Sequence, residues 1–365
     1  MKPLMRSLLT QAAWLVGLFS VLFLLAAVGE RADARRSGAA KLRAALFING
    51  TLGDKSFFDS AANGMRQARD TLPIFAKVVE GGTDPTRWQA ALTDLADSGD
   101  YDLIVAGTFT MVPYIQSVAQ QYPGARFIVF DAAVDYPKCG CRNVHSILFR
   151  QNEGAYLAGF LAARLDQAGL PGVPPGSGLG VVGGMQFPVI DDFIVGFRAG
   201  AQAAVPGETV LTQYANSFSD PAAGKEIAKA QFGRGVGLIF HAAGATGQGV
   251  NEAAREGHRY AIGVDMDQYT LYRHSNPALA SGIVTSVVKN VDVAVLRALG
   301  QALQGRLAYG QSESLGVAEH GVSLARGSEV LARAPPDVIR ALDATQAAVA
   351  RGELRVPSAF TPLHE

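Results

Sequence analysis

The chain has 365 residues, more than one compact core usually supports, so two domains are expected. Apolar residues make up 48% and charged residues 18%, and 41 glycines are present, a composition that excludes a disordered chain and indicates a glycine-rich globular protein. Lysine plus arginine and aspartate plus glutamate both number 32, and this balance argues against nucleic acid as a partner, since a DNA or RNA binder needs a basic surface.

The first residues have the order of an export signal. Lys2 and Arg6 precede an apolar run over residues 12–28, which is followed by the small-residue triplet Ala32-Asp33-Ala34. We predict a signal peptide over residues 1–34 and a periplasmic location. The run also has the length of a short transmembrane helix, so an uncleaved membrane anchor is the alternative. No cysteine lies near the predicted cleavage site, so a lipid anchor is not predicted.

From residue 44 onward, short apolar runs alternate with longer amphipathic segments. The short runs predict buried strands, and the segments with apolar residues at helical spacing predict helices. This alternation indicates the α/β class, with parallel sheets covered by helices. In the first half the predicted strands are 44–48, 74–79, 102–106 and 126–130, and the predicted helices are 58–71, 85–98 and 114–121.

A break rich in glycine and proline over residues 169–178 is followed by the same rhythm. Two similar α/β units in series are therefore predicted, with the boundary near Arg150. Residues after about 327 predict a helical tail packed on the outside. In the second half the predicted strands are 179–182, 210–214, 238–240, 260–264 and 281–287, and the predicted helices are 191–204, 221–232, 250–256 and 291–303.

Cys139 and Cys141 flank a single glycine and are the two cysteines of the chain. A zinc site normally needs four ligands, and the nearby His145 supplies one at most. Neither a metal site nor a cofactor is predicted. The pair either forms a disulfide that holds the loop or remains as two free thiols, with no role in function.

Residues just after the predicted strands are the candidates for a ligand site, because parallel sheets bind ligands at the carboxyl ends of their strands. In the first such loop, Phe57 either stacks on a planar ligand or, with Phe58, begins a buried helix. Asp54 either contacts the ligand or caps that helix, and Ser56 is interpreted as a helix cap in the same way. The loop at 217–220, which contains Phe218, follows another strand.

The loop at 244–249, which begins at Gly244, follows a strand and opens a helix as a phosphate loop does. It lacks the lysine that ends a triphosphate loop, so close approach to a neutral ligand is predicted instead. Asp131 and Asp265 end apolar strands and either accept hydrogen bonds from a ligand or cap helices. Lys289 either donates to a ligand oxygen or lies in solvent. No Ser/His/Asp arrangement is present, and the protein is not predicted to be an enzyme.

Five motifs follow one another along the chain: DKSF (54–57), EGAYLAG (153–159), AAGATG (242–247), AIGVD (261–265) and TSVVK (285–289). Together they resemble the basic membrane protein family of solute-binding proteins for ABC transporters. The resemblance runs from about residue 44 to 305. It implies the type I periplasmic-binding fold, in which two Rossmann-like lobes are joined by three crossover strands, and a purine nucleoside as ligand.

The resemblance also implies lobe limits. Lobe 1 is expected to comprise 41–150 and about 285–310, and lobe 2 to comprise 151–284 and about 311–327, with the tail at 328–365. It further implies roles for individual residues: Phe57 and Phe218 would sandwich the base, Asp131 would meet the base edge, and Gly244, Asp265 and Lys289 would hold the ribose.

The first loop departs from the family pattern at two places. Family members often have an aspartate where this chain offers Ile48 and Asn49, and an asparagine where it has Phe58. Losing a polar partner shifts selectivity, so a free purine base is expected to rival the nucleoside. The prediction is a monomeric periplasmic binding protein that serves an ABC permease in the inner membrane; a membrane-tethered ligand sensor and a nucleoside-processing enzyme are the alternatives.

Overall fold

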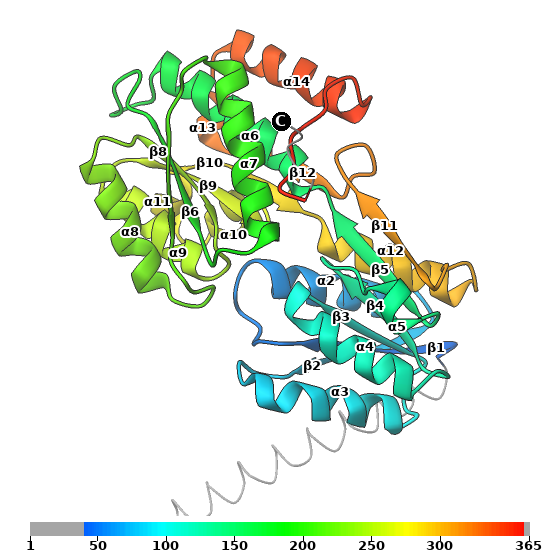
Figure 1. Ribbon diagram of the computed structural model, residues 1–365. Helices are drawn as coiled ribbons and strands as arrows, with labels where there is room; N and C mark the ends of the chain where they lie inside the picture. Colours follow the sequence, from blue (N-terminus) through cyan, green and yellow to red (C-terminus); the bar gives the residue numbers. More distant parts are fainter. Residues whose placement is uncertain (1–39, 361–365) are drawn as a thin grey trace, which may run out of the picture.

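The computed structural model describes residues 40–360, which form two α/β lobes (Figure 1). The predicted signal peptide lies outside these residues. Within them, no helix has the length and apolar character that a membrane crossing requires. The central strands of both sheets are buried along their whole length, as expected for parallel strands covered by helices on both faces.

Lobe 1 is built on a six-stranded sheet in the order β11-β5-β4-β3-β1-β2, in which all pairs are parallel. Helix α12 comes from late in the chain and packs against α2, where Asn63 donates to the Asp292 carboxylate. The strands are β1 (Leu42–Ile48), β2 (Ile74–Glu80), β3 (Leu103–Gly107), β4 (Arg126–Phe130), β5 (Val144–Phe149) and β11 (Gln311–Leu315); the helices are α2 (Phe57–Thr71), η1 (Pro85–Arg87), α3 (Trp88–Asp97), η2 (Phe109–Met111), α4 (Val112–Gln121), α5 (Tyr136–Cys139) and α12 (Val291–Leu303).

Lobe 2 has a second six-stranded sheet in the order β12-β10-β9-β8-β6-β7, parallel except for β12. Helices α6 and α7 pack closely together on it. The strands are β6 (Leu179–Gly183), β7 (Val210–Tyr214), β8 (Leu238–Ala242), β9 (Tyr260–Asp265), β10 (Ile283–Lys289) and β12 (Val322–Leu324); the helices are α6 (Gln151–Ala168), α7 (Pro188–Ala204), α8 (Pro221–Gly233), α9 (Thr246–Glu256), α10 (Gln268–Tyr272), α11 (Pro277–Ala280), α13 (Glu329–Ala332) and α14 (Pro336–Ala350).

The chain passes between the lobes three times, at Arg150, at Asn290 and over residues 316–321. These crossovers are tied to one another. The Arg150 guanidinium pairs with Glu153 and Glu319, and the Asn290 amide donates to the carbonyl of His320 at 2.8 Å. The three-crossover arrangement agrees with the fold that the resemblance implies.

Strand pairing differs from the expected lobe limits at two places. Strand β10 pairs with β9 in the lobe 2 sheet as far as Val288, although lobe 1 was expected to resume at about residue 285. Strand β11 pairs with β5 in lobe 1, although residues 311–327 were expected in lobe 2. The crossovers therefore fall after each of these strands, at Asn290 and after Leu315.

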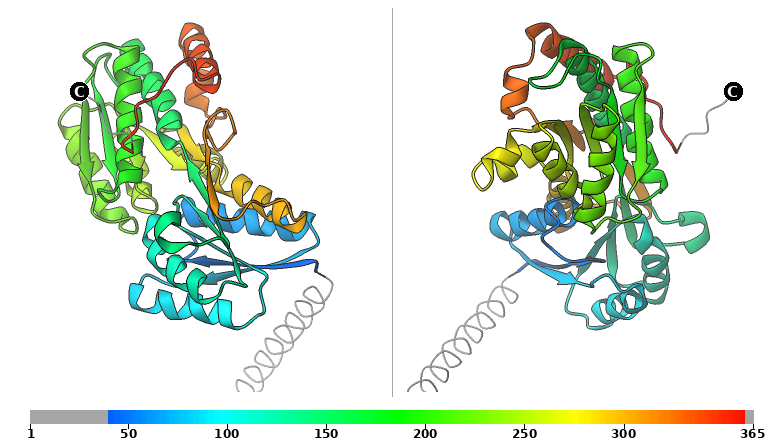
Figure 2. Two further views of the ribbon diagram at one scale, coloured as in Figure 1. Left: turned by 45° about the vertical axis from the view of Figure 1, so that its right-hand side comes forward. Right: turned by 90° about the vertical axis from the view of Figure 1, so that its left-hand side faces the viewer.

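The C-terminal part of the chain packs on lobe 2. Helix α14 contacts α6, and the segment Val356–Phe360, here called the strap, runs from α14 along α6 and α7 (Figure 2). The buried Asp192 carboxylate on α7 accepts hydrogen bonds from the Ser358 hydroxyl at 2.7 Å and the Ala359 N–H at 2.9 Å. The Asn152 side chain on α6 donates to two strap carbonyls. The strap thus joins the first turns of two helices.

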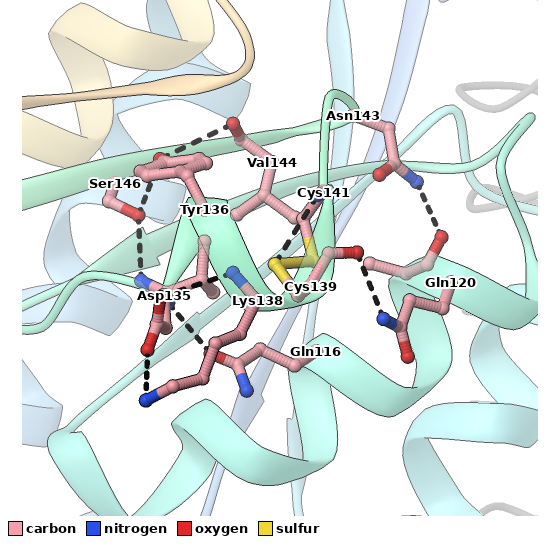
Figure 3. Close-up of a disulfide and its surroundings, with 12 residues drawn as sticks. Gln116, Gln120, Asp135, Tyr136, Lys138, Cys139, Cys141, Asn143, Val144 and Ser146 are labelled. Carbon is pink, nitrogen blue, oxygen red and sulfur yellow. Dashed lines mark hydrogen bonds and ion pairs between the residues drawn. A yellow bond between two sulfur atoms is a disulfide. The ribbon is translucent and has the colours of Figure 1, made fainter.

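A disulfide joins Cys139 and Cys141 at the connection between β4 and β5 (Figure 3). Of the two alternatives predicted for this pair, the structure has the disulfide. The surrounding side chains hold the same loop: Gln120 on α4 donates to the carbonyl of Cys139, and Asn143 donates to one carbonyl of α4 and to two in the turn between α4 and β4. The bond lies away from the residues where the lobes meet.

Candidate functional site

The carboxyl ends of the two sheets meet at a cluster of polar and aromatic side chains. Asp131 follows β4 in lobe 1, whereas Asp265 and Lys289 end β9 and β10 in lobe 2. The loop after β1 also reaches lobe 2, where the Gln248 side chain donates to the carbonyl of Asp54 at 3.1 Å. The strand-end rule therefore selects residues that the structure brings together.

Backbone strain concentrates at the same place. Seven non-glycine residues of the described chain have positive φ, and five of them either end a strand or lie in the loop that follows one: Lys55, Thr108, Asp131, Asn216 and Asp265. Such a conformation costs of the order of 1–3 kcal/mol per residue and persists where the surroundings impose it. At strand ends the strain turns the Asp131 and Asp265 side chains toward the other lobe.

Lys289 and Asp131 form a buried ion pair between the lobes. The lysine Nζ lies 2.7 Å from Asp131 Oδ1, with side-chain exposures of 2% and 9%. Three phenylalanine rings surround the ammonium group, Phe193 at 5.0 Å and Phe57 and Phe149 at 5.7 Å from their centroids. Burial raises the pKa of Asp131, and the nearby ammonium opposes that rise.

Asp265 is the second carboxylate of this cluster, and it is buried and accepts a hydrogen bond from the Ser56 hydroxyl of lobe 1. Burial raises its pKa to about 6, while Lys289 and the Ser56 hydroxyl oppose the rise; the carboxylates of Asp54 and Asp131 add to it. A carboxylate held in this way can accept hydrogen bonds from ligand hydroxyl or N–H groups.

The first loop uses much of its polar capacity internally. The Asp54 carboxylate accepts backbone N–H groups of Ser56, Phe58 and Asp59, so it caps the start of α2, the second of the two roles considered for it. The Asn49 amide donates to the hydroxyls of two threonines, Thr108 at 3.2 Å and Thr110 at 2.9 Å. Both side chains therefore stabilise the loops at the carboxyl end of the lobe 1 sheet, here called the lobe 1 rim.

The aromatic candidates lie in opposite lobes. The Phe57 ring packs against Phe58 at 5.5 Å and Phe130 at 5.4 Å between centroids. In lobe 2 the Phe218 ring lies so close to Gly184 that a Cβ there would come within 2.3 Å of it. Gly244 has φ +56°, and a Cβ there would come within 3.1 Å of the Phe218 carbonyl oxygen, so any other residue at this position would be strained.

Several contacts between the lobes involve residues that the sequence analysis did not select. Ser56 was interpreted as a helix cap, and Gln248 belongs to a glycine-rich loop interpreted through its backbone. The Lys55 ammonium lies 5.0 Å from the Tyr272 ring centroid, and the rings of Phe109 and Phe187 lie 4.3 Å apart. Most of these residues follow strand ends, and that position is the signal by which they could have been predicted. The sequence pattern does not show, however, which residues of one lobe contact which residues of the other.

His241 on β8 lies beneath the loop at 244–249. Its ring is fully buried, and burial lowers its pKa to about 4. A Cβ at Gly247 would come within 2.0 Å of its Nδ1, so the backbone of this loop packs directly on the ring and leaves no room for a side chain. Within residues 40–360, no group of three His, Cys, Asp or Glu side chains is arranged to hold a metal ion.

The family model for Bmp, described as ABC transporter substrate-binding protein PnrA-like, matches residues 41–349. The chain belongs to this family. Basic membrane protein B of Borrelia garinii subsp. bavariensis is 32% identical to this PnrA-like chain over 267 residues, 70% of the chain and 72% of the relative. The CD4+ T-cell-stimulating antigen of Listeria innocua is 29% identical and spans 91% of the chain and 94% of its own length.

Solved structures agree with the PnrA-like assignment. An ABC transporter solute-binding protein from Aeropyrum pernix K1 superposes with a TM-score of 0.75 at 26% identity, covering 87% of this chain and 94% of that one. One from Conexibacter woesei has a TM-score of 0.70 at 24% identity and supports the fold. The predicted family and the type I periplasmic-binding fold are therefore confirmed, and these structural neighbours are solute-binding proteins.

Proposed function

We propose that this ABC transporter substrate-binding protein closes its two lobes on a purine nucleoside or a free purine base. The observation that carries the proposal is the cluster at the carboxyl ends of both sheets, where the Lys289 ammonium lies beside the Phe57 ring, pairs with Asp131 and interacts with the charge of Asp265. A purine offers two aromatic faces and an edge of N–H and N groups, and its ribose offers hydroxyls. Each of these features matches one chemical type in the cluster.

Each candidate residue has a distinct part in this proposal. Phe57 and Phe218 stack on the two faces of the base, since one ring comes from each lobe. Asp131 accepts from the base edge, and Asp265 and Lys289 bind the ribose beside Gly244. Asp54, Asn49 and Phe58 support the rim of lobe 1, through the contacts described above, and Phe58 narrows the space over Gly50.

The charge of the cluster supports a neutral ligand. Asp54, Asp131 and Asp265 contribute three carboxylates, and Lys289 is already paired with one of them. A phosphate would add negative charge next to carboxylates in a buried setting, which is costly. The proposal therefore favours nucleosides and bases over nucleotides.

We further propose where the protein acts and to what it delivers its ligand. The protein is exported to the periplasm by the predicted signal at residues 1–34, acts there as a monomer, and delivers its ligand to an ABC permease in the inner membrane. Hinge closure about the three crossovers brings the two halves of the site together.

Binding titrations test the ligand class. We expect protein comprising residues 35–365 to bind adenosine, guanosine or inosine, or the corresponding free bases, and to show a rise in melting temperature with them. Phe218→Ala should weaken binding at least tenfold, since stacking is lost. Phe360→Ala, which changes an exposed ring on lobe 2, is the control. If uridine or ribose binds equally well, or if no purine binds, the proposed ligand class is excluded.

A further inference from the structure

Residues 54–56 form a short projection from lobe 1 into lobe 2, here called the latch loop. All three of its residues contact lobe 2: the carbonyl of Asp54 accepts from Gln248, the Lys55 ammonium lies over the Tyr272 ring, and the Ser56 hydroxyl donates to Asp265. Three contacts from three consecutive residues make this loop a principal bridge between the lobes on the side of β1.

Ser56 occupies the N-cap position of α2 but does not cap the helix. Its hydroxyl makes no hydrogen bond to the first turn, although serine is a favoured N-cap residue. The Asp54 carboxylate takes over that function by accepting the N–H groups of Phe58 and Asp59. The hydroxyl is thereby free to point across to Asp265, where it is fully buried.

The latch loop is held in shape by two carboxylates of its own lobe. Asp54 accepts from the Ser56 N–H at 3.0 Å, and Asp59 accepts from the N–H groups of Gly53 and Lys55 at 2.8 Å each. Lys55 has φ +51°, a strained conformation for lysine. A loop built in this way presents the Ser56 hydroxyl at a fixed position and loses little entropy when the lobes meet.

We propose that Ser56 is a positioning residue: it fastens lobe 1 to lobe 2 by donating to Asp265, and so orients that carboxylate for the ligand without touching the ligand itself. The bond occupies Asp265 Oδ2 and leaves Oδ1 for a ligand hydroxyl. The role in ligand orientation depends on the proposed function, but the role in lobe closure does not.

Two consequences follow for binding. Ser56→Ala removes a hydrogen bond to a charged group, so we expect about tenfold weaker binding of adenosine or adenine, mostly through faster dissociation. The Ser56 hydroxyl also favours the charged form of Asp265, which faces Asp54, Asp131 and Lys289. Removing it raises the pKa of Asp265, so the acid limb of the affinity profile should move to higher pH.

Ser60→Ala is a matched control. Ser60 is also buried, lies one turn further along α2, and accepts from the Asp292 N–H within lobe 1. We expect its affinity and pH profile to match those of the wild type within about twofold. In a double-mutant cycle, Ser56→Ala should lower the binding affinity little further in the Asp265→Ala background, because the two residues act together.

Small-angle scattering tests closure without relying on the ligand. We expect Ser56→Ala to have a larger radius of gyration than the wild type and Ser60→Ala under the same conditions. If the wild type binds no purine, the proposed function fails while the scattering comparison still tests the latch. If the wild type binds and Ser56→Ala matches it in affinity, acid limb and radius of gyration, the latch is excluded.

Discussion

The buried carboxylate of Asp265 lowers the free energy of unfolding at neutral pH. Burial raises the pKa of its carboxyl to about 6, whereas an unfolded aspartate titrates near its ordinary value of about 3.9. A group whose folded pKa is raised contributes stability that is complete below the unfolded pKa and is lost as the pH rises through the folded pKa. For Asp265 this window extends from about pH 4 to about pH 6, and the loss is of the order of 3 kcal/mol.

Asp265→Asn should therefore stabilise the protein while weakening binding. Asparagine tolerates the positive φ of this position and still accepts from Ser56, but it carries no charge that burial can penalise. We expect the free energy of unfolding to rise by up to about 3 kcal/mol at pH 7 and to match the wild type near pH 4. Urea titrations at the two pH values measure this.

Asp100→Asn, at an exposed loop position, is the control for that comparison and should show no such pH-dependent gain. A loss of stability in Asp265→Asn that is equal at pH 4 and pH 7 would contradict the assignment. It would mean that the carboxylate is held by contacts whose energy outweighs the cost of its burial.

At the scale of elements, the strap contributes stability through one buried acceptor. Ser358→Ala leaves Asp192 Oδ1 with the Ala359 N–H as its remaining strap donor. We expect the free energy of unfolding to fall by about 1 kcal/mol, the usual contribution of one hydrogen bond. Urea denaturation measures this change, and hydrogen exchange should show faster opening of the first turns of α6 and α7.

Ser98→Ala is the control for the strap. The Ser98 hydroxyl is exposed and donates to the carbonyl of Leu95 in its own helix end. A change within about 0.5 kcal/mol is expected there. If both variants lose the same stability, the strap contact contributes nothing specific.

Some elements were predictable from sequence and others were not, for physical reasons. Strands such as β3 and β8 are continuous apolar runs and were predicted to within two residues. Helix α6 was missed because 14 of its 18 residues are buried, so it shows no polar face to mark a helical period. Strand β11 was missed because its QSESL sequence is polar, which an edge strand allows.

The candidate site likewise combines residues that could be predicted from the sequence with contacts that could not. Asp131, Asp265 and Lys289 were predicted because each ends a strand, a local signal that needs no knowledge of the other lobe. The bond between Ser56 and Asp265 joins residues separated by 209 positions, and a local role as helix cap already explained the serine. Pairing across lobes depends on how they close, which strand and helix patterns do not encode.

At the scale of the molecule, neither lobe is a continuous piece of chain. Lobe 1 takes α12 and β11 from late in the chain, after most of lobe 2: α12 covers the apolar face of α2, and β11 pairs with the edge of β5, both of which residues 40–150 alone would expose. We expect a fragment of residues 40–150 to remain poorly folded, with little dispersion in its amide NMR spectrum.

Joining residues 40–150 through a short flexible linker to residues 291–315 should restore folding, because α12 and β11 can then reach α2 and β5. Thermal unfolding of this linked lobe should be cooperative. A well-folded 40–150 fragment would show instead that the lobe 1 sheet is stable without its late-joining partners.

The three crossovers also have a consequence for the order in which the chain can fold as it is synthesised. His145 on β5 meets Glu313 on β11, 168 residues later, and Asn63 on α2 meets Asp292, 229 residues later. While lobe 2 is being made, lobe 1 has an open sheet edge and an uncovered helix face, the surfaces on which aggregation begins. Lobe 2 also waits for β12, so neither half reaches its final form before the last sixth of the chain is available, and the two complete their folding nearly together.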